Sequence, residues 1–213
     1  MAIAVDSTSS GYVTSADSGT SFNVSHTCTG SNLVLVVIVS QTDGVGTNPS
    51  VTYNGVAMTL VDSIDSSMAS FIFALVNPAT GTHNITVTKA ASTNVAAANV
   101  SFNGAGGYSA HSAASANNAS AASVTVNTAT TGNGYVAAGA IANDVGITMT
   151  YAGSGTQFVN TDTGPQIFTG AYTYFASGAD VTESWTHGST KWAITGIEVY
   201  ELATDTGGMF FML

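Results

Sequence analysis

Four side chains near the end of the sequence form its densest group of residues that could do chemistry. Glu183, Trp185 and His187 occupy alternate positions, so a strand would place them on one face. Segment 187–190 predicts a hairpin that sets Trp185 opposite Trp192. A carboxylate beside two indole rings can bind a sugar by stacking and hydrogen bonding. We favour the alternative, an aromatic pair in the core or an interface, with Glu183 held by a neighbouring hydroxyl.

His26 and Cys28 give a weaker indication of chemistry. They alternate on one predicted strand, as a cysteine–histidine nucleophilic pair would. No group that would orient such a pair or stabilise an oxyanion lies near them in the sequence. A metal site at the pair would need one or two further ligands, and the remaining histidines are scattered. We therefore interpret this segment as the ordinary end of a strand.

Acidic residues suggest one catalytic possibility. Two pairs have the residue type that glycosidases use for catalysis: Asp62 with Asp65, and Asp180 with Glu183. Acidic residues in loops also solvate turns, or hold Ca²⁺ together with backbone carbonyls. We predict no catalytic residue, no cofactor and no metal ligand, and Ca²⁺ is the one ion that we consider as an alternative.

The charge balance excludes whole classes of partner. Only 7% of the 213 residues are charged, and the net charge is −10 with two cationic side chains, Lys89 and Lys191. Nucleic-acid binding needs several cationic residues to neutralise phosphates, and anionic membrane surfaces attract the same residues. We therefore predict neither a nucleic-acid partner nor a membrane partner.

Strand patterns must supply the elements that position these residues. Residues 33–39 form an uninterrupted apolar run, typical of a central strand buried on both faces. The pair Asn54-Gly55 predicts a type I′ turn, with Tyr53 opposite Val56 in a tight hairpin. Further strand-like segments follow at regular spacing. Together these patterns predict an all-β fold, a two-sheet antiparallel β-sandwich of the jelly-roll type.

We predict one β-sandwich domain over residues 1–204. Residues 103–122 are rich in Gly, Ser, Ala and Asn, which predicts a long loop or a crossover between the halves of the domain. Residues 205–213 form a tail that ends in five apolar residues: Met209, Phe210, Phe211, Met212 and Leu213. This tail is either the last core strand or an anchor that inserts into a neighbouring subunit. The Gly-Gly pair before it favours the anchor.

Four stretches carry the clearest strand and turn patterns: residues 32–37, 51–61, 73–88, and 181–185 with 192–199. On these stretches the chain resembles a jelly-roll-like β-sandwich domain family that recurs in phage virion structural proteins and bacterial surface proteins. The resemblance spans about residues 20 to 202 and implies a fold more than a function. In this family the face that holds Glu183 is usually apolar, so this residue departs from the pattern.

These observations favour a structural or binding protein over an enzyme. The resemblance implies a virion protein made in the host cytoplasm: a capsid decoration (cement) protein, or a head or tail fibre component. Its partners would be other virion proteins, such as a major capsid protein. Few lysines and prolines are present to protect edge strands, which favours a homo-oligomer or a lattice-bound protein.

Other functions remain open from the sequence. The main alternative is a carbohydrate-binding or adhesion module that recognises surface glycans. The sequence offers less support for a glycan-active enzyme, or for an extracellular filament subunit at the bacterial cell surface.

Overall fold

Three antiparallel sheets contain all the strands in the described part of the chain. The computed structural model describes residues 2–14, 20–42, 48–89, 94–130, 132–143, 147–163, 166–176 and 178–203. The central sheet has the order β1 (Ala4–Val13), β9 (Val95–Asn103), β3 (Val34–Thr42), β7 (Met68–Val76) and β6 (Thr59–Asp65). The four-stranded sheet has the order β2 (Ser21–Cys28), β8 (Gly81–Thr88), β4 (Ser50–Tyr53) and β5 (Val56–Ala57).

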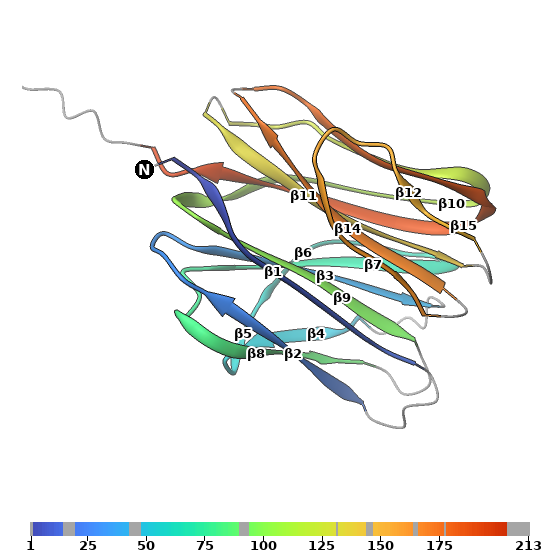
Figure 1. The fold of residues 1–213 in the computed structure, drawn as a ribbon, viewed down its shortest axis with the longest axis horizontal. Coiled ribbons are helices and arrows are strands. Elements are labelled where there is room, and N and C mark those ends of the chain that lie inside the picture. The colour runs from blue at the N-terminus through green and yellow to red at the C-terminus, as the bar shows by residue number, and fades with distance from the viewer. Residues whose placement is uncertain are drawn as a thin grey trace, which may run out of the picture.

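The six-stranded sheet contains the second half of the chain. Its order is β10 (Ala105–Val126), β15 (Val181–Glu201), β11 (Gly134–Asn143), β14 (Gln166–Phe175) and β13 (Thr156–Asp162). The short strand β12 (Thr150–Tyr151) also pairs with β15. Figure 1 shows the three sheets as stacked layers, with the central sheet between the other two.

Strand β3 shows why the layers stack in this way. Every residue of β3 is buried, and its neighbours in the central sheet are β7 and β9. Val36 and Ile38 face the six-stranded sheet, whereas Leu35 and Val37 face the four-stranded sheet. The predicted central strand, buried on both faces, is confirmed.

The predicted all-β, antiparallel sandwich is also confirmed, but the described residues form three sheets where the sequence predicted two. The apolar run in β3 shows that both faces of its sheet are buried, yet it does not show that a separate layer covers each face. The jelly-roll order of strands stays a prediction.

The predicted hairpin at Asn54-Gly55 is confirmed. Both residues have positive φ angles, 49° and 77°, as a type I′ turn requires. Tyr53 pairs with Val56 across the turn, which joins β4 to β5.

Residues 105–126 form β10, the longest strand in the described part of the chain, so the loop or crossover predicted over residues 103–122 is wrong. The pairing of β10 with β15 runs from Ala105–Glu201 to Val126–Val181, interrupted by shifts in register. The two strands bend together and fold back over the outer face of their own sheet (Figure 1). We call this paired segment the folded ribbon. Its many Ala and Ser residues suit a strand here, because small side chains let two layers approach closely.

Candidate functional site

Three of the four residues in the predicted C-terminal cluster are buried. Glu183 and Trp185 are 0% exposed, and Trp192 is 7% exposed. The predicted hairpin at 187–190 is wrong, because β15 continues through these residues as one strand, which pairs with β10 on both sides of residues 187–189. The bend of the folded ribbon nevertheless brings both indole rings into the same core cluster. The two rings are therefore core residues, and they cannot stack on a sugar from solution.

His187 is the exception in this cluster, since it is only half-buried. Its Nδ1 donates a hydrogen bond to the carbonyl oxygen of Gly188 at 2.6 Å. This local contact does not connect the imidazole to Glu183, so the structure does not bring the predicted carboxylate and imidazole together through a hydrogen bond.

The Glu183 carboxyl lies in a mostly apolar environment with few donors. Tyr151 donates its hydroxyl proton to Glu183 Oε2 at 2.5 Å, and the Tyr151 oxygen accepts from the Gly155 amide at 3.0 Å. Thr173 Oγ1 lies 3.2 Å from the same tyrosine oxygen. Burial raises the pKa of Glu183, and the Thr173 and Tyr151 hydroxyls offset only part of that effect. Burial and the neighbouring carboxyl together raise the pKa of Tyr151 to about 12.

A second buried glutamate on the same strand has the opposite environment. Five donors reach the Glu198 carboxylate: the Ser109 and Thr130 hydroxyls, and the backbone amides of Ala110, Ala129 and Thr130. Burial acts to raise the pKa of Glu198, but these hydrogen bonds together hold it below its ordinary value. The ionised carboxylate therefore ties β15 to β10 and to the segment that follows β10.

A network of polar side chains connects β1, β2 and β9 on the side of the central sheet that faces the four-stranded sheet. Ser101 donates to Asp6 Oδ2 at 2.9 Å, so its oxygen can accept from His26 Nε2 at 3.0 Å. Asn99 donates to Ser9 Oγ at 3.1 Å, and Ser9 can donate to His26 Nδ1 at 2.8 Å. This order of donors assigns the neutral imidazole, with its proton on Nε2. Burial lowers the pKa of His26 to about 4, although Asp6 opposes the effect.

Cys28 lies on the same buried face of β2 as His26. Burial raises the pKa of its thiol, which favours the protonated form. Ser101, which lies between the imidazole and Asp6, is 0% exposed. The arrangement thus joins β1, β2 and β9 through hydrogen bonds, and its hydroxyl and thiol face the interior.

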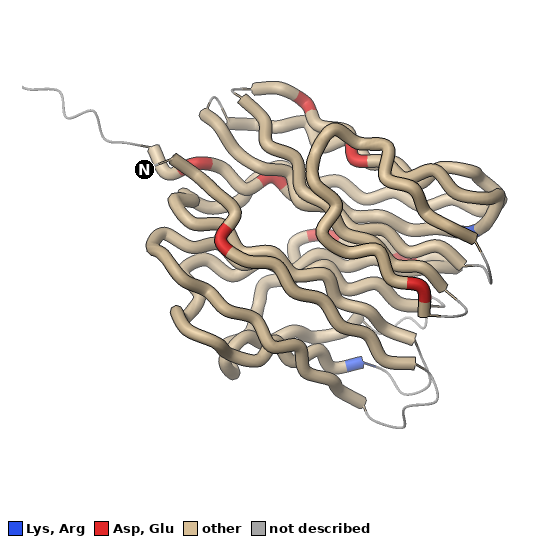
Figure 2. Tube along the Cα trace, in the orientation of Figure 1, with Lys and Arg blue, Asp and Glu red and all other residues tan. Residues whose placement is uncertain are grey.

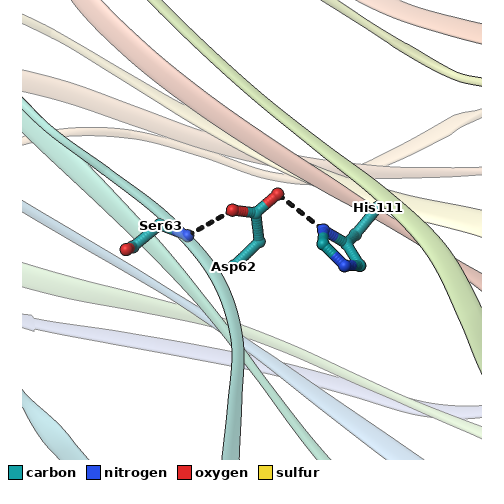
Figure 3. A network of polar contacts seen from close by, with 3 residues as sticks. All are labelled: Asp62, Ser63 and His111. Atoms are coloured by element: carbon teal, nitrogen blue, oxygen red, sulfur yellow. Dashed lines mark hydrogen bonds and ion pairs between the residues drawn. The ribbon is translucent and has the colours of Figure 1, made fainter.

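Asp62 links two edge strands, as Figure 3 shows. Its Oδ2 lies 2.7 Å from Nδ1 of His111 on β10, and its Oδ1 accepts from the Ser63 amide at 2.8 Å. The contact therefore bridges β6 of the central sheet and β10 of the six-stranded sheet. Within the described ranges, no three His, Cys, Asp or Glu residues come together in a group that could hold a metal ion.

Register shifts interrupt the pairing of four edge strands. They lie between Val5 and Ser7 in β1, between Leu60 and Asp62 in β6, between Gln157 and Val159 in β13, and at four places in β10. Such irregularities protect an edge from pairing with another chain. Register shifts therefore supply protection at these four edges that lysine and proline do not, and the predicted homo-oligomer or lattice-bound state stays a prediction.

Only 7% of the residues are charged, and Figure 2 shows those in the described part of the chain at scattered points of the trace. Six large hydrophobic residues are exposed in the described part of the chain: Tyr12, Val56, Leu60, Val76, Tyr174 and Leu202. The predicted anchor residues Met209, Phe210, Phe211, Met212 and Leu213 lie outside the described residues. No helix among the described residues has the length and apolarity needed to cross a membrane.

Comparison with known proteins gives no match, either to a protein-family model or to a curated protein. The resemblance to the jelly-roll-like family of virion and surface proteins therefore stays a prediction.

Proposed function

We propose that the protein is a structural component of a phage particle, either a capsid decoration protein or part of a head or tail fibre. The observation that carries the proposal is a chain with only 7% charged residues that folds as a stack of three sheets. In this role the protein acts through contacts of its surface with other virion proteins, and a major capsid protein is the first candidate for a partner.

Desolvation explains why few charges suit this role. A contact between subunits removes water from both faces, and the centres of protein interfaces are depleted of charged residues because burying a charge is costly. Only 7% of the residues of this chain are charged. Faces rich in Ser, Thr and Asn can be covered at a lower cost, and their contacts depend little on salt.

The buried polar groups also suit a structural role. The donors around Glu198 and the network around His26 each connect segments that lie far apart in the sequence. These groups satisfy one another inside the protein, where they add specificity to the stacking of the sheets. A decoration protein needs such rigidity, because it contributes by holding its shape between capsid subunits.

Labelling of intact particles tests the virion assignment. Antibodies raised against the purified chain should label particles banded in a density gradient from a culture that produces the protein, in a regular pattern under the electron microscope. Particles that carry no label, while the protein remains in the soluble fraction, would overturn the assignment.

A second measurement tests the assembly argument itself. The complex of the chain with those particles should survive a rise from low to molar salt, because its contacts depend little on charge. Release of the chain by salt alone would show that the few charged side chains, and not the neutral faces, hold it in place.

A further inference from the structure

A cavity with an aromatic wall opens on the six-stranded sheet. It has a volume of about 300 Å³, and its lining comes from β11, β13, β14 and the segment before β13. The lining residues are Tyr135, Ser154, Gly155, Thr156, Tyr172, Thr173 and Tyr174. Every side chain in this set is either an aromatic phenol or an aliphatic hydroxyl, apart from the glycine, and none carries a charge at neutral pH.

The three tyrosines form a connected group. Tyr135 pairs with Tyr174 across the two strands, and their ring centroids are 5.4 Å apart with an interplanar angle of 69°. Tyr172 lies 5.9 Å from Tyr135 at 77°. Phe158 stacks on Tyr172, and Phe102 packs on Tyr135. The two phenylalanines therefore support the rings of Tyr172 and Tyr135 from the core. Tyr174 is 51% exposed, which leaves its ring available to a ligand.

Contacts on the other face of β14 hold the backbone beside the tyrosines in place. Thr173 alternates with Tyr172 and Tyr174, so its buried side chain lies on that other face, where its Oγ1 is 3.2 Å from the Tyr151 hydroxyl that donates to the buried Glu183. Gly155 approaches Thr173 so closely that a Cβ at this position would overlap the threonine Oγ1. The cavity wall is thus preorganised by core residues, as a binding site requires.

We propose that this cavity binds the ring of a neutral pyranose sugar. A pyranose has an apolar face of C–H groups, which an aromatic ring attracts, and a rim of hydroxyls, which exchange hydrogen bonds with Ser, Thr and Tyr hydroxyls. The volume lies at the small end of the range for ligand pockets, so it suits one sugar ring. An uncharged lining offers no ion pair to an anionic or cationic ligand.

This site differs from the cluster that the sequence suggested. The sugar-binding interpretation of Trp185 and Trp192 fails because both rings are buried, whereas Tyr174 is exposed. The inference goes beyond the proposed structural role and does not depend on it, because a particle protein and a free module can both bind sugars. A negative result in the particle-labelling experiment would therefore overturn only the proposed structural role, and a negative result in the sugar titration would overturn only the sugar site.

Nuclear magnetic resonance of the full chain with ring-labelled tyrosine provides the test. The probes are the methyl pyranosides of glucose, galactose, mannose and N-acetylglucosamine, each titrated to millimolar concentrations. We expect at least one pyranoside to shift the ring signals of Tyr135, Tyr172 and Tyr174 in a saturable way. Tyr174→Ala should weaken that binding by at least tenfold, because it removes the exposed ring.

Two further variants make the test specific. Tyr12→Ala is the matched control, because Tyr12 is 48% exposed on β1 and does not line the cavity; it should leave the affinity unchanged. Thr156→Val keeps the shape of an exposed lining residue but removes its hydroxyl, so it should weaken binding by a few-fold. The inference is overturned if no pyranoside shifts the three ring signals, or if Tyr174→Ala binds as the wild type does.

Discussion

Glu183 and Glu198 on strand β15 are both 0% exposed, yet their surroundings shift their pKa values in opposite directions. Five donors converge on Glu198, and its pKa is lowered. Glu183 receives a hydrogen bond from the Tyr151 hydroxyl, and its pKa is raised. Neither side chain is exposed to solvent, but Glu183 lies deeper in the protein, so the difference comes both from stronger desolvation at Glu183 and from the larger number of donors at Glu198.

The source of the donors explains the contrast. Glu198 lies where β10 begins and where the chain leaves β10, so irregular backbone with free amides surrounds it. Glu183 belongs to the folded ribbon and shares a face with Trp185, where neighbouring backbone groups are already paired within strands and the core contains mainly alanines and tryptophan. The pKa of a buried carboxyl is therefore lowered where the backbone offers free amides, and raised where the neighbouring amides are already paired in a sheet.

The largest test of this comparison is Glu198→Gln. The amide keeps the size of the side chain but loses the charge, and its NH₂ group faces donors where an acceptor stood. We expect a loss of about 3 kcal/mol in the free energy of unfolding, because several buried donors lose their acceptor. Urea unfolding at neutral pH measures it. Glu183→Gln is the matched control, and an equal loss in both variants would remove the distinction between the two sites.

A pH titration tests the same effect of burial at His26, on the other side of the central sheet. The pKa of His26 is about 4 in the folded chain and rises to its ordinary value of about 6.5 on unfolding. The unfolded state therefore binds more protons below about pH 6.5, and this group should cost the fold about 2 kcal/mol by about pH 5. Urea midpoints across this range measure the loss. His26→Gln should abolish that part of the slope, and an unchanged slope would show that another group causes it.

Removal of the Tyr151 hydroxyl sharpens the comparison at the Glu183 site. Tyr151→Phe takes away the donor to the carboxyl and the acceptor of the Gly155 amide. We expect a loss of about 1 to 2 kcal/mol in the free energy of unfolding. Tyr174→Phe should cost nothing measurable, because that residue is exposed. Equal effects of the two variants in thermal unfolding would mean that the buried hydrogen bonds contribute no net stability.

The smallest effect concerns the protonation of Glu183 itself. Its raised pKa means that the unfolded chain gives up this proton at lower pH than the folded chain does, so the wild type loses stability as pH rises above the ordinary glutamate value of about 4.3. Glu183→Gln is neutral at every pH and escapes the loss. Its stability relative to the wild type should therefore increase with pH, and a constant difference between pH-matched urea curves would contradict the raised pKa.

The sequence could predict the strands better than the sites. The apolar run of β3 and the Asn54-Gly55 turn follow from local rules, and both predictions are confirmed. The ribbon over residues 105–126 could not be predicted, because its small side chains resemble those of a loop and only its partner β15 makes it a strand. To predict this strand, the sequence of residues 105–126 would have to be considered together with that of β15.

The sites depend on contacts between distant residues, which no local pattern contains. Glu198 is the one charged residue between Trp192 and Tyr200, a signal that was available in the sequence, but its donors come from residues 109–130. The tyrosine cavity gathers Tyr135, Tyr172 and Tyr174 from two strands whose register the sequence does not state. The burial of Trp185 and Trp192 could not be predicted from their spacing, because it depends on how the folded ribbon packs on its own sheet.

The order of the sheets along the chain determines when each can form during synthesis. The central and four-stranded sheets use only residues 4–103, so all their strands are synthesised before the second half of the chain. Strand β15, which pairs with β10, β11 and β12, emerges last, roughly 5 to 20 s later at typical rates of translation. The face of the central sheet that carries Val36 and Ile38 packs on residues of the six-stranded sheet, so it lacks its full cover until that sheet is complete. A nascent chain stalled before β15 should therefore be the form of this protein that chaperones bind most strongly.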